Sequence, residues 1–505
     1  MHIVLHPLDQ VLSAEPGTAL QDVLFQQGVE FPCGGQGRCR GCRIKVLAGT
    51  LPPQPEDLLA FTQAELAEGW HLACRARVTS DLRLELAQWE TPILSDDTTF
   101  AFTPRAGLGV AIDLGTTTLV AQLLDLQTGR VLAVRTALNA QAQFGADVVS
   151  RIEFALTESG EQKLQALIRE QVGNLIANLL NTAQDSAGLM EVVIVGNTVM
   201  HHFFCGLSVE PLSHAPFTPR VTGLQQFSAA DLRWALPKDA VIRFLPCLGS
   251  FVGSDLLAGI LATRLHDSPR LSALVDLGTN GEIVLGNHDR ILCASTAAGP
   301  AFEGARISMG MRAATGAIAA VHFSGERFEC HVLGDSPPRG ICGSGLVDAV
   351  AAGLDSGCIA ASGKFTTPDP LRLSAPVCLT QADVRELQLA KGAIAAGLRI
   401  MLEHWGAKPS DLERIYLAGA FGNYINVASA RRIGLLNYGP DKIQPAGNTA
   451  LLGAKLALFN LIEDSGTYSD LLAKVTHLPL NEDGRFQEVF VEELSFPPVQ
   501  EQTAN

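Results

Sequence analysis

The sequence has no long uncharged apolar run and no excess of basic residues, and both absences limit what the protein can do. No stretch of the chain holds 18 apolar residues in a row without a charged residue. The opening MHIVLHPLDQ lacks the basic start and apolar core of a signal peptide. A net charge of −15 argues against binding to nucleic acid or anionic membranes, which requires a basic surface. We therefore expect a cytoplasmic protein whose partners are small ligands or other proteins.

Charged residues make up only 18% of the chain, whereas 47% of it is hydrophobic. A composition of this kind favours a well-buried globular protein. The 505 residues exceed the roughly 250 to 300 at which a single core stops growing, so we expect two to four domains. Seven of the 11 cysteines are scattered singly, and we interpret them as small buried side chains in a reducing compartment.

The other four cysteines form a pattern near the N-terminus. Cys33, Cys39 and Cys42 lie in the glycine-rich run FPCGGQGRCRGC, and Cys74 follows in WHLACRARV. A structural zinc site usually uses two compact pairs of ligands. Three ligands in one loop and a distant fourth are closer to a ferredoxin, in which four thiolates hold two irons. The spacing predicts a [2Fe–2S] cluster on all four cysteines, with zinc as the alternative.

A strand, a polar turn and a second strand occur twice later in the chain. Residues 110–125 read VAIDLGTTTLVAQLLD, and residues 273–286 read ALVDLGTNGEIVLG. The aspartate of such a turn can hold Mg²⁺ through its waters, while the turn offers N–H and hydroxyl donors to phosphates. One copy could be an ordinary hairpin, but two copies could grip a triphosphate from both sides. The candidate residues are Asp113, Gly115, Thr116 and Thr117 in the first turn, and Asp276, Gly278, Thr279 and Asn280 in the second.

A third stretch completes a nucleotide site. Residues 415–426 read IYLAGAFGNYIN, a strand followed by Gly419 and Gly422, where a ligand can approach the backbone, and then by Asn423. DLGTTT, DLGTNGE and LAGAFGN resemble the phosphate-1, phosphate-2 and adenosine motifs of the actin, sugar kinase and Hsp70 superfamily (ASKHA). The resemblance implies ATP and Mg²⁺ as ligands.

Two connecting motifs of the same superfamily are also recognisable by resemblance. EVVIVGNTVMHHFF contains Asn197 and Thr198, one of which is expected to cap a helix, and GNTALLGAKLAL at 447–458 resembles the second connecting motif. Glu282 and Glu303 are the acidic residues expected near a γ-phosphate, with ordinary structural hydrogen bonding as the alternative for each. The catalytic candidates are Asp113, Asp276 and Glu303.

Two helices outside these motifs carry expectations of their own. A helix in LPCLGSFVGSDLLAGILA is expected to be capped by Ser254 or Asp255 and to bridge to the second half. A helix over 379–402 is expected to have a polar face that includes Arg385, Glu386 and Lys391. By resemblance to the superfamily this helix lines the adenosine pocket, and the alternative is a face exposed to solvent.

The chain as a whole resembles one family. CGGQGRCRGC, WHLACRARV, DLGTTT, VGNTVMHH, AGPAFEGA, GICGSGLVDA and LAGAFGNYI occur in one order that is similar to the reductive activators of corrinoid enzymes. The resemblance implies a multidomain α/β and α+β fold, with a β-grasp ferredoxin-like domain before a duplicated actin-like ATPase. The expected domains are a ferredoxin-like domain at 1–90, a linker at 91–107, actin-like halves at 108–245 and 246–495, and a tail at 496–505.

The family also implies a function, namely ATP-dependent reduction of inactive Co(II) to Co(I). The partners would be a corrinoid protein or corrinoid-dependent methyltransferase and a low-potential electron donor, and a homodimer is left open. One alternative is an activator of a dehydratase, which usually carries a [4Fe–4S] cluster shared across a dimer. Another is a nonenzymatic actin-like adaptor that binds nucleotide.

Overall fold

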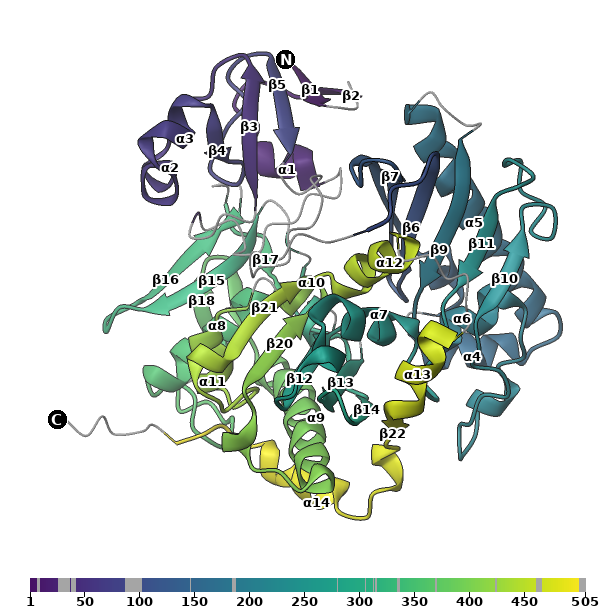
Figure 1. Ribbon diagram of the computed structural model, residues 1–505. Helices are drawn as coiled ribbons and strands as arrows, with labels where there is room; N and C mark the ends of the chain where they lie inside the picture. Colours follow the sequence, from purple (N-terminus) through teal and green to yellow (C-terminus); the bar gives the residue numbers. More distant parts are fainter. Residues whose placement is uncertain are drawn as a thin grey trace. The chain divides into compact units, whose positions relative to one another are not determined.

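The computed structural model describes residues 1–6, 10–25, 37, 42–86, 102–145, 147–183, 188–278, 280–304, 306–311, 313, 316–333, 337–367, 370–422, 425–459 and 466–498. The chain divides into two compact units, and Figure 1 traces their elements. Unit 1 consists of Met1–Glu30, Arg40–His266 and Asn448–His477, and unit 2 consists mainly of Asp267–Gly447 and Leu478–Asn505. In the part of the chain just given, no helix is long and apolar enough to cross a membrane.

The N-terminal part of unit 1 is a mixed five-stranded sheet in the order β2-β1-β5-β3-β4. Strand β1 is parallel to β5, and the other neighbours are antiparallel, as expected for a β-grasp domain. Leu20 and Leu24, one helical turn apart, are both fully buried. The elements are β1 (His2–His6), β2 (Gln10–Ser13), α1 (Leu20–Phe25), β3 (Arg43–Ala48), α2 (Pro55–Ala60), α3 (Gln63–Ala67), β4 (Trp70–Leu72) and β5 (Leu82–Leu86).

A six-stranded sheet in the order β10-β11-β9-β6-β7-β8 forms the rest of unit 1. Its central strand β6 is antiparallel to β7 and parallel to β9. The strands are β6 (Leu108–Leu114), β7 (Thr118–Asp125), β8 (Val131–Leu138), β9 (Leu189–Val195), β10 (Gln225–Ser228) and β11 (Val241–Phe244). The helices are η2 (Ala140–Phe144), α4 (Val148–Ala155), α5 (Gly160–Ala183), α6 (Thr198–Cys205), η3 (Glu210–Leu212), α7 (Ser254–Thr263), η4 (Leu265–Asp267), α12 (Thr449–Phe459) and α13 (Gly466–Lys474), and β22 (Val475–His477) follows α13.

Unit 2 repeats this pattern. Its main sheet contains the order β21-β20-β12-β13-β14, in which β12 is antiparallel to β13 and parallel to β20. The strands are β12 (Ser272–Leu277), β13 (Gly281–Gly286), β14 (Ile291–Thr296), β15 (Ala317–Phe323), β16 (Phe328–Val332), β17 (Gly340–Ile341), β18 (Leu371–Ser374), β19 (Val377–Leu379), β20 (Arg414–Ala418) and β21 (Ile443–Gly447). The helices are η5 (Pro300–Glu303), α8 (Gly343–Asp355), α9 (Gln381–Trp405), η7 (Pro409–Asp411), α10 (Gly419–Gly422), α11 (Val427–Arg432), η8 (Pro440–Lys442), η9 (Leu480–Glu482) and α14 (Phe486–Glu493). The same strand arrangement around β6 and β12 is the duplication that the sequence predicted.

Helix α12 returns from the end of unit 2 to unit 1, where it packs on α7, β6 and β9. Gly453 permits the contact, because a Cβ at this position would overlap the carbonyl of Ala258 on α7. Helix α7 therefore belongs to unit 1, whereas the sequence analysis placed it in the second half. Its N-cap is Gly253, so the predicted cap at Ser254 or Asp255 is wrong.

The end of the predicted linker is anchored on α12. The Phe102 ring lies 4.7 Å from the ring of Phe459. The Arg105 guanidinium donates to Leu458 O at 2.6 Å and pairs with Glu191, a nearly fully buried carboxylate on β9. Arg243 on β11 also pairs with Glu191, so the two arginines together compensate this buried carboxylate.

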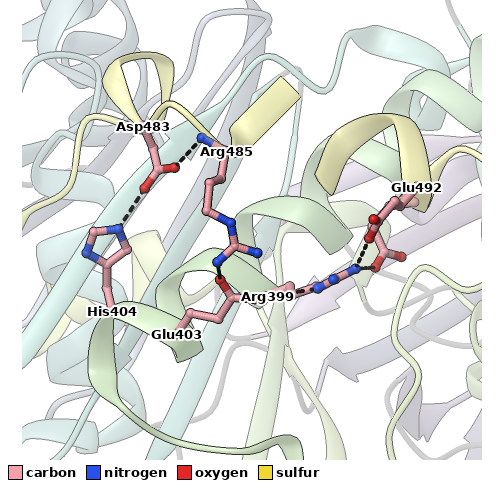
Figure 2. A network of polar contacts seen from close by, with 7 residues as sticks. Arg399, Glu403, His404, Asp483, Arg485 and Glu492 are labelled. Atoms are coloured by element: carbon pink, nitrogen blue, oxygen red, sulfur yellow. Dashed lines mark hydrogen bonds and ion pairs between the residues drawn. The ribbon is translucent and has the colours of Figure 1, made fainter. Parts of the chain in front are cut away.

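The C-terminal helix α14 is tied to α9 by a network of ion pairs, which Figure 2 shows. Arg399 contacts Glu492 at 2.7 Å, Arg485 contacts Glu403 at 2.6 Å, and His404 Nε2 lies 2.7 Å from Asp483. Exposed pairs of this kind contribute roughly 0 to 1 kcal/mol each. The network therefore orients α14 more than it stabilises the unit.

Beyond α14 the chain stays packed on unit 2. Phe496 is 2% exposed and its N–H donates to Ala361 O at 2.8 Å, so this residue of the predicted tail belongs to the folded part. Lys391 is 1% exposed, and its Nζ donates to Ser495 O at 2.7 Å. Lys391 therefore does not face solvent as the polar face was expected to do, because it holds the C-terminal segment.

We predict that Gly453→Ala destabilises the protein by roughly 2 kcal/mol, since the added methyl group forces α12 away from α7. Unfolding in urea would measure the change. Gly223→Ala is the matched control in the same unit, because a Cβ there would have no neighbour within 4 Å. Equal stability of the two variants would contradict the close helix contact.

Candidate nucleotide and cluster sites

The first aspartate turn links β6 to β7. Asp113 lies opposite Val120 on β7 and Val195 on β9, and Gly115 begins the turn. The Gly115 N–H donates to Thr118 O at 3.1 Å. A Cβ at Gly115 would lie 2.5 Å from that oxygen, so no larger residue fits this turn.

Three consecutive carbonyls of this turn are held by the protein itself. Asn139 Nδ2 donates to Gly115 O at 2.9 Å, and the Asn139 N–H donates to Thr117 O at 2.9 Å. Arg151 Nη2 donates to Thr116 O at 2.7 Å. In a trans peptide the N–H points away from the C=O. The N–H groups of Thr116 and Thr117 therefore point away from these partners, and no acceptor for them occurs among the described residues. Such an arrangement suits an anion such as phosphate.

Arg151 is the main anchor behind the turn. It is fully buried on α4, and its Nε also donates to Gly145 O at 2.9 Å. Burial lowers the pKa of Arg151 to about 10, so the guanidinium is still charged at neutral pH. Neither Arg151 nor Asn139 was predicted from the sequence. The available signal for Arg151 was an arginine next to the apolar Ile152 in the stretch VVSRIEFA.

Asp113 has the features of a cation ligand. Its Oδ2 accepts a hydrogen bond from Asn448 Nδ2 at 3.0 Å, and burial raises its pKa to about 6. Within the described ranges, Oδ1 accepts no hydrogen bond. A desolvated carboxylate with one oxygen unengaged fits hydrated Mg²⁺, whose positive charge would favour the ionised form. Asn197, another predicted residue, lies at the same turn and donates to Thr116 Oγ1 at 2.8 Å.

The second aspartate turn lies beside the predicted adenosine motif. Asp276 on β12 pairs with Ala418 on β20, and a Cβ at Gly419 would lie 2.5 Å from Asp276 Oδ1. Gly419 has a φ of +81°, which favours glycine. The Gly278 N–H donates to Asn280 O at 3.1 Å. The structure therefore brings the second phosphate motif and the first glycine of the adenosine motif together.

The remaining nucleotide candidates are less well defined by the structure. Gly422 ends α10, where a Cβ would lie 3.0 Å from the backbone of Leu417. Thr279 and Asn423 lie outside the described residues.

The two acidic candidates differ in where they lie. Glu303 is the last residue of η5, and its catalytic role stays a prediction. Glu282 lies directly opposite Asp276 in the β12–β13 pair, so both side chains are on one face of the sheet. Of the two acidic candidates, Glu282 is therefore the one placed on the same face of the sheet as Asp276.

Two of the predicted cluster ligands come together in the ferredoxin-like domain. Cys42 directly precedes β3 and Cys74 follows β4, and the Ala73 N–H donates to Cys42 O at 3.1 Å. Both cysteines are buried and neither forms a disulfide. Cys33 and Cys39 lie outside the described residues. Buried, unoxidised cysteines on adjacent strand ends fit two of the four thiolates of a [2Fe–2S] cluster.

These features define a class of protein, in which a ferredoxin-like domain and a duplicated actin-like ATPase body share one chain. Family comparisons agree along the length of the chain. Residues 3–79 match the 2Fe-2S iron-sulfur cluster binding domain, residues 108–268 match the RACo middle region, and residues 270–505 match the C-terminal ASKHA domain of RACo.

Individual relatives and one solved structure point the same way. The chain is 37% identical over 414 residues to the corrinoid activation enzyme RamQ of Eubacterium limosum, with 76% of this chain and 69% of that protein covered. It is 29% identical over 426 residues to the [Co(II) methylated amine-specific corrinoid protein] reductase of Methanosarcina barkeri, with 77% of each covered. A solved reductive activator for corrinoid, iron-sulfur protein is 27% identical, has a TM-score of 0.70 and aligns over 98% of both chains. The chain belongs to the family of reductive activators of corrinoid proteins.

We predict that Asp113→Asn stabilises the free protein by about 3 kcal/mol at pH 8, because it removes a carboxylate that is ionised against a raised pKa. The folded protein binds this proton more tightly than the unfolded chain does. The cost of ionising Asp113 therefore fades as the pH falls through about 6 toward 4. Unfolding midpoints of both proteins, measured without Mg²⁺ or nucleotide from pH 8 to pH 4, would test this. A gap that does not change with pH would contradict it.

Proposed function

We propose that the protein is an ATP-dependent activator that returns the cobalt of a partner's corrinoid from inactive Co(II) to Co(I). The partner is a corrinoid protein or a corrinoid-dependent methyltransferase, and a low-potential donor supplies the single electron. The observation that carries the proposal is a [2Fe–2S] domain and a two-part ATPase body on one chain, aligned end to end with a corrinoid activator. A homodimer is compatible with the proposal but is not required by it.

The proposed electron transfer to cobalt is thermodynamically unfavourable, and the ATPase body can offset its cost. Ferredoxin-like clusters lie near roughly −400 mV, and each ~100 mV of uphill one-electron transfer costs about 2.3 kcal/mol. Binding and hydrolysis of ATP can offset this cost by favouring a complex in which cobalt is easier to reduce. Methylation of Co(I) afterwards also draws the reaction forward.

The chain's own residues divide this work. The N–H groups of Thr116 and Thr117 would bind phosphate oxygens, and Asp113 would hold Mg²⁺ through its waters. Asp276 is the corresponding candidate of the second phosphate motif. Gly419 permits the close approach of the Asp276 carboxylate to the adenosine motif. Gly419, Gly422 and Asn423 of this motif would hold the nucleoside.

The ferredoxin-like domain carries the redox centre. Cys33, Cys39, Cys42 and Cys74 are the proposed ligands, and a bound [2Fe–2S] cluster supplies one-electron transfer. Cys42 and Cys74 lie next to the paired strands β3 and β4, so the backbone places these two residues at adjacent strand ends. The cysteines of the described ranges form no disulfides, which suits the reducing cytoplasm that we propose for the protein.

The match of residues 3–79 to a [2Fe–2S] domain favours this function over the dehydratase alternative. Activators of that second kind usually carry a [4Fe–4S] cluster shared across a dimer. The adaptor alternative makes no use of a redox domain.

An absorbance assay for Co(II) to Co(I) conversion tests the proposal directly. It would use the full chain with its cluster reconstituted, a corrinoid protein encoded nearby, a low-potential reductant and ATP. We expect conversion with ATP and little without it. Failure to convert any such corrinoid protein, with or without ATP, would overturn the function.

Two variants should separate the redox and nucleotide parts. We expect Cys42→Ala to abolish cobalt reduction while ATP hydrolysis continues. Asp276→Ala should abolish ATP hydrolysis while the visible absorbance of the cluster is unchanged. Loss of ATP hydrolysis in Cys42→Ala, or loss of the cluster absorbance in Asp276→Ala, would argue against two separable parts.

A further inference from the structure

The tripeptide Gly-Asn-Thr occurs at the start of two helices of unit 1. Asn197 caps α6, and its Oδ1 accepts from the Met200 N–H at 3.0 Å. Asn448 directly precedes α12, and its Oδ1 accepts from the Leu451 N–H at 2.8 Å. Both side chains therefore satisfy a backbone donor of the helix that follows.

The caps determine which way each amide points. Because Oδ1 accepts from the helix, Nδ2 is directed outward as a donor. Asn197 Nδ2 donates to Thr116 Oγ1 at 2.8 Å, and Asn448 Nδ2 donates to Asp113 Oδ2 at 3.0 Å. Two residues from distant parts of the sequence thus contact the same phosphate turn.

Capping alone does not require asparagine at either place. Serine and aspartate cap helices about as well, but serine is too short to reach the turn and ionised aspartate cannot donate. Asparagine is the capping residue that can both accept from the helix and donate to a carboxylate. The outward hydrogen bond therefore gives Asn448 a second task besides starting α12.

We propose that Asn448 is a positioning residue that holds the Asp113 carboxylate in the orientation that receives the Mg²⁺ of Mg·ATP. The hydrogen bond to Oδ2 restricts rotation of the carboxylate and leaves Oδ1 for the water shell of the cation. Asn197 holds the Thr116 hydroxyl of the same turn. This inference rests on the proposed nucleotide site.

The test compares nucleotide affinity with and without Mg²⁺. A fluorescent ATP analogue is titrated into the wild-type protein, Asn448→Ser and Asn448→Thr, first with Mg²⁺ and then with EDTA. Serine and threonine keep the cap but lose the donor to Asp113. Threonine is the second variant in case serine impairs folding. We expect the gain in affinity from Mg²⁺ to fall about tenfold in both variants, with affinity in EDTA unchanged.

Asn287→Ser is the matched control. Asn287 also accepts from backbone N–H groups, those of Asp289 and Arg290, but in the hairpin turn between β13 and β14. The Asn287→Ser protein should bind Mg·ATP like the wild-type protein. A double variant with Asp113→Asn completes the design, because Asn448→Ser should have no further effect on the gain from Mg²⁺ once the carboxylate is absent.

Two results would overturn the inference. One is an unchanged gain from Mg²⁺ in the Asn448 variants. The other is an equal loss of affinity with and without Mg²⁺, which would make Asn448 a cap only. Because the assay contains no corrinoid, a failure of cobalt reduction would overturn the proposed function and leave this result standing.

Discussion

The proposed nucleotide site depends on keeping backbone carbonyls away from a negatively charged ligand. A phosphate is attracted by N–H groups and repelled by carbonyl oxygens, so a turn can bind it only if its carbonyls point elsewhere. In the first turn, Asn139 and the buried Arg151 hold the carbonyls of Gly115, Thr116 and Thr117. Much of unit 1 is needed for this, since Arg151 lies on α4 and Asn139 follows β8.

The path of the chain brings the start of α12 to the same turn. After β21 the chain leaves unit 2 and forms α12, which packs on α7 across Gly453 and begins beside Asp113. The first and the last parts of the actin-like body therefore meet at one carboxylate. A domain boundary drawn as a single cut in the sequence cannot represent this arrangement.

Much of this architecture was predictable from the sequence, because strand–turn–strand patterns and glycine spacing are local. The duplication and a cap at Asn197 or Thr198 followed from such patterns, whereas the β-grasp domain was implied by the resemblance to the activator family. Contacts over long sequence distances were not predictable in this way. Nothing in the sequence near Asn448 indicates that it donates to Asp113. Likewise, nothing near Lys391 indicates that Ser495 and Phe496 pack over it. The assignment of Glu303 also depends on tertiary position, which helix and strand periodicity does not encode.

One consequence follows from how α12 is held at its two ends. Asn448 touches the phosphate turn at its start, while Leu458 and Phe459 at its end hold Arg105 and Phe102. Phe102 and Arg105 lie where the chain enters the actin-like body after the ferredoxin-like domain. At about 1.5 Å per residue, the helix is a stiff rod of roughly 16 Å. Both ends of α12 are thus fixed, one at Asp113 and the other where the chain enters this body, so a change in the position of α12 would alter both sets of contacts together.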